Sequence, residues 1–403
     1  MDELDRDLEL LQQRKDAWAR LPVGTKIEYL LSIRANTLKH AEGWVNASVA
    51  AKSIPANSPL AGEEWISGPW ALLYALNRYV ATLTQIKRFG SPQLPPGSVR
   101  ERHDGQVVVD VFPNSIYDRV LLSGVSAEVW MQPGVTPENL QPTLGVFYQK
   151  TLPEGTVALV LGAGNISSIA PLDVLCKLLA DGSVCLLKLN PVNAYLGPIF
   201  ESVFAPLVVG GYLRIAYGGA DIGAYLTAHK LVDEIHITGS DKTHDAIVQS
   251  LPTAKPITSE LGNVSPTIVV PGDWSSRDFD FQAQNIVTQK MHNGGFNCIA
   301  AQVLVLPRDW DGTPKLLAAI DAVMKRTQPR IAYYPGAADR WGTLVSAHPD
   351  AQTFDTEVDG AAPRTLLHAD PDAQDPLFAN EAFCATLGVV QLPGDASAFL
   401  NGA

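Results

Sequence analysis

The stretch TVALVLGAGNIS, residues 156–167, sets an apolar run directly before two glycines, an asparagine and a serine. Three later runs have the same character and alternate with helical segments: SVCLLKL, LRIAYGG and EIHITGS. Parallel strands need crossover connections that cover both faces of the sheet, so such strands are apolar throughout. The sequence therefore predicts a doubly wound α/β domain, whose ligands lie beyond the carboxyl ends of its strands.

The first 150 residues have a different pattern. Apolar residues recur near a 3.6-residue period from residue 3 to about residue 90, which predicts several packed helices. The Pro-rich segment 91–98 ends this pattern. The apolar runs 107–109 and 129–131 then predict strands of an ancillary sheet.

Composition limits the partners of the chain. Its 403 residues have a formal net charge of -12, so nucleic acid and anionic membrane surfaces would repel it, and we expect a small-molecule partner and no nucleic acid. The N-terminus is charged from its second residue, and the uncharged stretch 156–172 is interrupted by Pro171, so we expect a cytoplasmic protein with no membrane span. The four cysteines form no CxxC pair and accompany no His cluster, so we expect free thiols and no metal site.

Polar residues follow the apolar runs, where a bound ligand is expected. They are Asn165, Lys188, Gly239 with Ser240, and Glu260 with Leu261. Further on, NGGFNCIAAQ (293–302) sets Cys298 behind two glycines. A single free cysteine is more often a small buried residue than a nucleophile, so the surrounding motifs must decide its role.

Together these motifs resemble the aldehyde dehydrogenase superfamily, whose members use NAD or NADP. Five features occur in one order: Asn165, Lys188, ITGS (237–240), SELGNVSP (259–266) and NGGFNC (293–298). The resemblance covers about residues 150–390. It implies a cofactor-binding domain over 1–258, with a helical part over 1–90 and a Rossmann-like core over about 150–258. A second α/β domain, the catalytic domain, is implied over 259–403.

The resemblance also implies roles for individual residues. Cys298 would attack the aldehyde carbon, and the side-chain amide of Asn165 and the backbone N–H of Cys298 would stabilise the oxyanion. After hydride transfer to NAD or NADP, Glu260 would activate the water that hydrolyses the Cys298 thioester. The implied cofactor-binding residues are Lys188, Asn190, Gly239, Ser240, Leu261 and Glu381.

The chain departs from the family pattern in several places. Asn190-Pro191 follows Lys188 closely, with no acidic residue in the usual place, which leaves NAD and NADP both open. Phe296 stands where a glutamine is usual. Family members continue beyond the point where this chain stops, at Ala403, so we expect a C-terminally truncated chain with an incomplete catalytic domain. We expect a homo-oligomer if the missing stretch is present.

Less specific readings remain for several residues. Asn165 could cap the following helix, Lys188 could be a solvated strand end, Gly239-Ser240 could form only a turn and helix cap, and Glu260 could be a surface charge. Cys176 and Cys185 lie in apolar patterns and are predicted to be core residues. Two other functions stay open: a CoA-acylating aldehyde dehydrogenase (an acyl-CoA reductase), and a catalytically silent family member used for binding or assembly.

Overall fold

A computed structural model describes residues 1–403 except 56, 355–357, 362 and 372–373. The α-helices are α1 (Asp2–Ala19), α2 (Val23–Ala51), α3 (Ala61–Trp65), α4 (Ala71–Phe89), α5 (Ile116–Leu121), α6 (Pro137–Leu140), α7 (Ile169–Cys176), α8 (Gly197–Val203), α9 (Ala205–Gly210), α10 (Ala220–Ala228), α11 (Asp241–Ser250), α12 (Ser276–Met291), α13 (Thr313–Arg326), α14 (Ala337–Ala347) and α15 (Ala396–Gly402).

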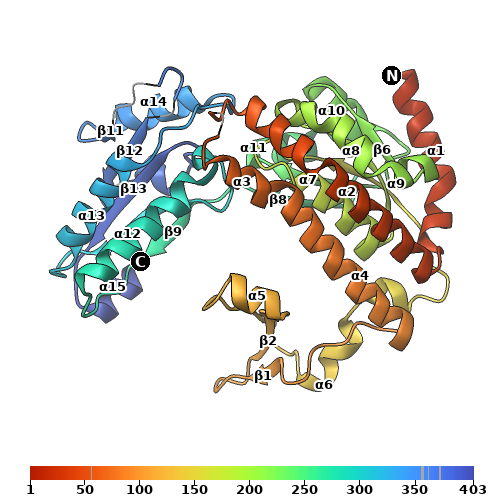
Figure 1. Cartoon of the computed structure of the whole chain (residues 1–403), viewed down its shortest axis with the longest axis horizontal. Helices are drawn as coiled ribbons and strands as arrows, with labels where there is room; N and C mark the ends of the chain where they lie inside the picture. The colour runs from red at the N-terminus through yellow and green to blue at the C-terminus, as the bar shows by residue number, and fades with distance from the viewer. Residues whose placement is uncertain (56, 355–357, 362, 372–373) are drawn as a thin grey trace.

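The strands form three sheets. They are β1 (Val99–Glu101), β2 (Val107–Phe112), β3 (Ala127–Trp130), β4 (Val157–Leu161), β5 (Val184–Lys188), β6 (Leu213–Ala216), β7 (Glu234–Gly239), β8 (Ile257–Leu261), β9 (Ser265–Ile268), β10 (Ala301–Pro307), β11 (Gln352–Phe354), β12 (Arg364–Ala369) and β13 (Thr386–Leu392). Figure 1 shows the sheet that contains β6 and β8 on the right and the sheet that contains β9 and β13 on the left, with the small sheet of β1 and β2 below.

The first large sheet has the strand order β6-β5-β4-β7-β8, and all its pairs are parallel. Every residue of β5 is buried, and so are the first four of β4, because helices cover both faces. The N-terminal helices share this core through Leu8 of α1, Ile33 of α2 and Leu72 of α4. The predictions of a doubly wound sheet and a helical N-terminal segment are therefore confirmed.

The second large sheet has the order β11-β12-β13-β10-β9, parallel except for β11. Helices α12 and α13 pack on one face, where Ile286 and Ile320 join a buried cluster with Leu304 of β10. The chain passes from β8 of the first sheet to β9 of the second within residues 262–264. A second α/β unit is therefore present, while the division of the domains at 258/259 stays a prediction.

The third sheet, β1-β2-β3, is antiparallel and contains the strands expected at 107–109 and 129–131. Helix α5, which follows β2, has its polar side inward. Asp118 is buried and pairs with Arg78 of α4, whereas the apolar residues of the helix are exposed. The exposed apolar residues of α5 are Ile116, Tyr117, Val120 and Leu121.

One core prediction is wrong. Cys185 is fully buried in β5, but Cys176 is exposed at the end of α7. Helix α7 directs Val174 and Leu175 into the core, so the next residue along the helix turns away from the sheet. Burial within an apolar helix follows the side of the helix, not the local sequence alone.

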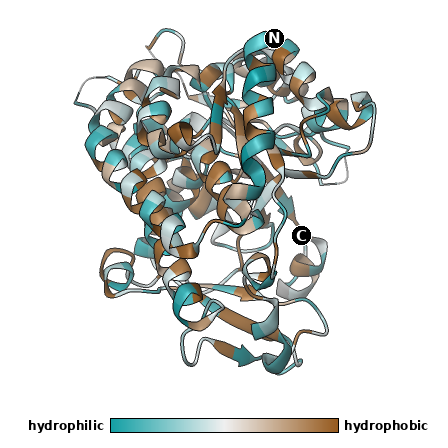
Figure 2. Cartoon of the chain, turned by 90° about the vertical axis from the view of Figure 1, so that its right-hand side faces the viewer, coloured by the Kyte–Doolittle hydropathy of each residue, from teal (hydrophilic) through white to brown (hydrophobic). Residues whose placement is uncertain are grey.

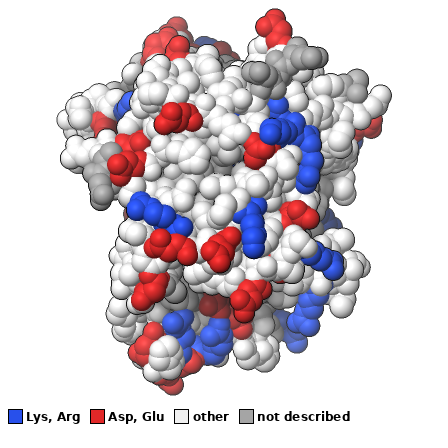
Figure 3. Space-filling model, turned by 90° about the vertical axis from the view of Figure 1, so that its left-hand side faces the viewer, with Lys and Arg blue, Asp and Glu red and all other residues white. Residues whose placement is uncertain are grey.

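The distribution of hydrophobic and charged residues over the helices is that expected for a layered α/β interior. Most helices in Figure 2 carry hydrophobic and hydrophilic colours on the same ribbon, as expected for helices with one face on a core. Figure 3 shows acidic and basic side chains interspersed on the face that it presents. No helix in the described part of the chain is long and apolar enough to cross a membrane.

Candidate active site

The sequence-predicted residues gather at one edge of the first sheet. Asn165 lies four residues after β4, and Lys188, Gly239 and Leu261 are the last residues of β5, β7 and β8. Because the strands are parallel, these carboxyl ends meet at the same edge. Gly239 and Leu261 are direct partners in the ladder, as are Thr238 and Glu260.

Asn165 joins the first sheet to the segment that carries Cys298. The residue is buried, and its Nδ2 donates a hydrogen bond of 2.9 Å to the backbone oxygen of Phe296, two residues before Cys298. Helix α7 starts only at Ile169, with Ser168 at its N-cap and no side-chain cap, so the reading of Asn165 as a helix cap is wrong. A primary amide has two N–H groups, and the second one has no acceptor among the described residues, so it is available to another group.

The segment before Cys298 has an unusual backbone. Asn293, Gly294 and Gly295 have φ angles of 54°, 67° and 84°, in the left-handed region. A Cβ on Gly295 would lie 2.4 Å from the backbone oxygen of Cys384 in the chain that leads into β13. Glycine is therefore required there, and the two segments pack backbone against backbone beside Cys298.

The thiol of Cys298 is half-buried in an acidic environment. Burial raises its pKa, and the negative charges of Glu381 and Glu260 raise the pKa further, against backbone N–H groups that lower it. In the chain alone, Cys298 is therefore held as a neutral thiol at neutral pH. Attack on a carbonyl requires removal of the proton by a base or a change in these charges.

Glu381 lies closely against the loop between the two large sheets. A Cβ on Gly262 would come within 2.1 Å of its Oε2, so the glycine allows the close approach of the carboxylate. Burial raises the pKa of Glu381 to about 7, although Lys290 and Arg340 act in the opposite direction. Its Oε1 is buried and has no hydrogen-bond partner among the described residues.

Glu260 differs from Glu381 in its surroundings. Its side chain is exposed at the end of β8 and has no hydrogen bond or ion pair with the residues that the structure describes. It nevertheless lies near enough to Cys298 to influence the pKa of the thiol. An exposed, unpaired carboxylate beside a half-buried cysteine is free to contact a water molecule near the sulfur.

The remaining residues at or after the strand ends are Lys188, Asn190 and Ser240, and they differ in their contacts. Lys188 is buried, and burial lowers its pKa while Asp221 of α10 raises it. Asn190 accepts a hydrogen bond of 3.0 Å from the backbone N–H of Val192 and thereby caps the 3₁₀ turn Pro191–Leu196. Ser240 accepts a bond of 3.2 Å from Thr243, so its cap role at α11 is confirmed.

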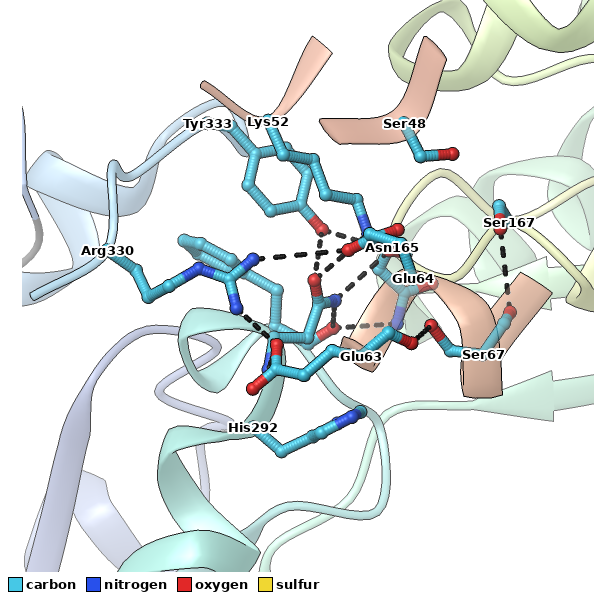
Figure 4. Close-up of polar contacts among 12 residues, drawn as sticks. Ser48, Lys52, Glu63, Glu64, Ser67, Asn165, Ser167, His292, Arg330 and Tyr333 are labelled. Carbon is cyan, nitrogen blue, oxygen red and sulfur yellow. Dashed lines mark hydrogen bonds and ion pairs between the residues drawn. The ribbon is translucent and has the colours of Figure 1, made fainter. Parts of the chain in front are cut away.

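Sequence reasoning missed a buried polar cluster behind Asn165, shown in Figure 4. The cluster consists of Lys52, Glu63, Glu64, Asn293, Arg330 and Tyr333. Asp221 was missed as well. Asn293 belongs to the NGGFNC motif (293–298), although its role there was not recognised, whereas the other residues lie in segments with no motif of their own and reach the site only through tertiary packing.

The site and the fold are those of an α/β protein with a cysteine loop facing the strand ends of a dinucleotide-type sheet. A family model described as the aldehyde dehydrogenase family matches residues 135–346, more than half of the chain, and the chain therefore belongs to this family. The chain is 38% identical over 102 residues to D-glyceraldehyde dehydrogenase (NADP(+)) of Thermoplasma acidophilum, a match that covers 25% of this chain and 20% of that protein. It is 30% identical over 188 residues to rat (Rattus norvegicus) 4-trimethylaminobutyraldehyde dehydrogenase, covering 42% and 36% of the two chains.

Solved structures are similar over the whole chain. An aldehyde dehydrogenase of Bartonella henselae has a TM-score of 0.68 at 15% identity, and the match covers 100% of this chain and 76% of that one. Glyceraldehyde-3-phosphate dehydrogenase of Methanocaldococcus jannaschii, solved in complex with NADP, has a TM-score of 0.67 at 13% identity, covering 100% and 78%. The fold is therefore that of these enzymes, whereas the matches to the two curated relatives span well under half of their lengths.

Proposed function

We propose that this chain catalyses the NAD(P)-dependent oxidation of an aldehyde to a carboxylic acid through a thiohemiacetal and a thioester on Cys298. The observation that carries the proposal is the bond between the Asn165 amide and the Phe296 carbonyl, which joins the strand-end loop to the Cys298 segment. This bond holds an amide donor, with one N–H still available, near Cys298, whose thiol is influenced by the charges of Glu381 and Glu260. Family membership supports the same reaction.

In the first step Cys298 adds to the carbonyl carbon, and its proton leaves to a base. The second N–H of Asn165 and the backbone N–H of Cys298 are the donors available to the oxyanion. Donors fixed before the reaction are effective because they need no reorganisation when the charge develops, and loss of one typically costs about 100- to 1,000-fold in rate. Asn165 is buried and held by Phe296, as such a donor must be.

The residues at the strand ends fit a nicotinamide cofactor. Lys188 has no hydrogen bond with the described residues, and the buried Oε1 of Glu381 has no donor, so both suit sugar hydroxyl groups. The N-terminus of α11, with Gly239 and Ser240 before it, suits a phosphate, with Asn190 and Leu261 nearby at the same edge. The bound cofactor would accept the hydride that the substrate carbon releases.

Glu260 is assigned to the last step, the hydrolysis of the thioester. Its exposed carboxylate near Cys298 can accept a proton from water. CoA-acylating chemistry would use the same thioester with another thiol in place of water, and it remains the alternative. A silent member used for binding is the less favoured alternative, because Asn165, Glu260 and Cys298 are all retained and gathered at one site.

The choice between NAD and NADP depends on residues that the sequence motifs did not include. Asp221 acts on Lys188 from the start of α10 and adds a carboxylate where the sequence suggested none. A carboxylate there would oppose a 2′-phosphate, while Lys188 would attract it. Because Lys188 and Asp221 have opposite effects on a 2′-phosphate, we propose that the cofactor is NAD or NADP.

The apolar residues of α5 are exposed, and we also propose that the chain self-associates through this side of the helix.

The test follows the reduced cofactor and the protein mass after mixing the full chain with NAD or NADP and a panel of aldehydes. The wild type should produce reduced cofactor, and Cys298→Ser should produce none. Glu260→Gln should give about one equivalent per site in a burst, followed by turnover slowed at least about 100-fold, with an acyl adduct on Cys298. Rescue of that variant by added CoA would favour the acylating alternative, and a wild type that neither reduces cofactor nor forms an adduct would contradict the proposal.

A further inference from the structure

A buried polar cluster lies directly behind Asn165, and the reaction steps above make no use of it. We propose that Lys52, Asn293 and Tyr333, here called the Asn165 clamp, are positioning residues that fix the Asn165 amide in front of Cys298. This inference rests on the proposed function and goes beyond it, because none of the three residues has a role in that reaction scheme. Figure 4 shows Lys52 and Tyr333 side by side as they approach Asn165, although they lie far apart in the sequence.

The clamp holds the peptide carbonyl of Asn165. This oxygen accepts hydrogen bonds from the Tyr333 hydroxyl at 2.9 Å, from Asn293 Nδ2 at 3.1 Å and from Lys52 Nζ at 3.3 Å. A carbonyl oxygen has two lone pairs, so three donors fully occupy it. The backbone of Asn165 is thus fixed on one side while its side chain bonds Phe296 on the other.

Asn293 links the Asn165 loop to the Cys298 segment. Its Nδ2 donates to the carbonyl of Asn165 and, at 3.2 Å, to the carbonyl of Phe296, the same oxygen that the Asn165 amide contacts. Its Oδ1 accepts from Lys52 at 3.0 Å and lies 3.1 Å from the Tyr333 hydroxyl, whose single proton is shared between this oxygen and the Asn165 carbonyl. Asn293 therefore uses its whole side-chain hydrogen-bonding capacity, and it adopts the left-handed conformation, at φ 54°, to do so.

Lys52 is 2% exposed at the C-terminal end of α2. Its Nζ has three acceptors: Glu64 Oε1 at 2.9 Å, Asn293 Oδ1 and the Asn165 carbonyl. Three acceptors match the three N–H groups of an ammonium ion. Buried ion pairs contribute little to stability compared with apolar side chains of the same size, so a role in fixing geometry explains this pair better than a role in stability.

Two residues of the clamp lie beside open space. Lys52 and Tyr333 border a cavity of about 320 Å³, together with Asn193 and Tyr195. Lys52 and Tyr333 therefore have space to shift if the clamp is weakened, and the Asn165 carbonyl that they hold would lose these donors. Small displacements of a catalytic donor are costly, since about 1 Å can lower a rate about 100-fold.

The matched pair for the test is Tyr333→Phe and Tyr334→Phe. Both rings pack on Phe296, with centroid distances of 5.1 and 5.8 Å, but only the Tyr333 hydroxyl bonds Asn165. Burial raises the pKa of Tyr333, so its hydroxyl stays protonated and able to donate. Removal of one oxygen atom thus separates the clamp from general packing of the two tyrosines.

Two reactions of Cys298 report on the clamp separately. With p-nitrophenyl acetate, sulfur bonds to the acyl carbon, the ester C–O bond breaks, and p-nitrophenolate leaves while the thiol proton passes to solvent. This acylation passes through an oxyanion and needs the Asn165 donor, whereas alkylation by iodoacetamide displaces iodide at a saturated carbon and needs no such donor. Peptide mapping assigns each adduct to Cys298, because Cys176 is exposed as well.

We expect Tyr333→Phe to acylate at least about tenfold more slowly than the wild type, with alkylation within about twofold, because only the donor is displaced. Asn293→Asp, which puts an acceptor against two carbonyls, should show a larger loss of the same kind, as should Asn165→Ala. Tyr334→Phe should resemble the wild type in both reactions. Equal acylation in the wild type, Tyr333→Phe and Asn293→Asp, or an equal loss of acylation and alkylation, would overturn the clamp. A wild type that is alkylated at Cys298 but never acylated would overturn the proposed function itself.

Discussion

At the scale of single residues, the strand-end rule locates much of the candidate site from sequence alone. Asn165, Lys188 and Leu261 follow apolar runs, and parallel pairing brings them to one edge. The residues that surround them are not predictable in this way. Lys52 and Tyr333 reach Asn165 from positions 113 and 168 residues away, and local sequence has no information on such contacts.

The acidity of the Cys298 environment leads to a prediction at this scale. Burial and the charges of Glu381 and Glu260 raise the pKa of the thiol, so alkylation should accelerate only above neutral pH. Glu381 itself has a pKa of about 7 and is therefore charged over that range. Glu381→Gln removes this charge, and we expect the midpoint of the alkylation profile to shift to lower pH. The rate of iodoacetamide labelling against pH measures the shift.

The control for this experiment is Glu9→Gln, which removes one charge from an exposed position on α1. It should leave the Cys298 profile unchanged, because screening weakens the effect of distant exposed charges. If Glu381→Gln leaves the midpoint in place, or moves it to higher pH, the electrostatic account of this cysteine is wrong.

At the scale of helices and strands, periodicity predicted most of the fold. The apolar runs became β4, β5, β6 and β7, and the 3.6-residue pattern became α1, α2 and α4. The pattern fails where tertiary context decides which side faces inward. Cys176 lies outside the core, and α5 buries Asp118 while its apolar residues face outward, although both helices look ordinary in sequence.

Lys26 connects three elements and gives a prediction at this scale. It is 1% exposed on α2, its Nζ has no hydrogen-bond partner among the described residues, and it lies 4.9 to 5.3 Å from the rings of Trp18, Phe147 and Tyr148. Burial lowers its pKa from 10.5 to about 8. Between these pH values the unfolded chain binds more protons than the folded one, so this residue makes the free energy of unfolding rise with pH.

Below pH 8 both states are protonated, and the full cost of burying the charge is present. Lys26→Met lacks this titration, so the stability of the wild type relative to the variant should increase as the pH rises from 8 to 10.5. Urea unfolding of both proteins across this range measures the difference. Lys39→Met, at an exposed position of the same helix, is the control and should show no such trend. A constant difference between wild type and Lys26→Met would show that the charge is not buried as described.

At the scale of the whole molecule, two layered α/β units have their own apolar clusters, and the polar cluster behind Asn165 joins them. Arg330, after α13, pairs with Glu63 of α3, while Asn293 donates its backbone N–H to the same carboxylate at 3.1 Å. The residues that we propose to react come from both units, since Asn165 follows β4 and Cys298 precedes β10. The site therefore depends on the relative placement of the two units, which explains why so many buried polar contacts gather at this junction.

The third sheet has a surface that neither unit covers. Ile116, Tyr117, Val120 and Leu121 of α5 are each 68 to 75% exposed, and β3 is an exposed edge strand of its sheet. Contiguous apolar surface and a free strand edge both favour association with another chain. The proposed self-association uses this side of α5, and its strength should depend on the apolar character of these residues.

Leu121→Glu tests this dependence, because it places a charge at a position that is 73% exposed and should leave the fold intact. We expect the dissociation constant of the oligomer to rise by at least about tenfold, since burying an unpaired carboxylate at an interface costs more than about 1.4 kcal/mol. Sedimentation velocity over a range of concentrations measures the change. Val209→Glu, at a position 88% exposed on α9, is the matched control and should associate like the wild type. A wild type that stays monomeric at every concentration, or a Leu121→Glu variant that associates equally well, would show that α5 meets no second copy.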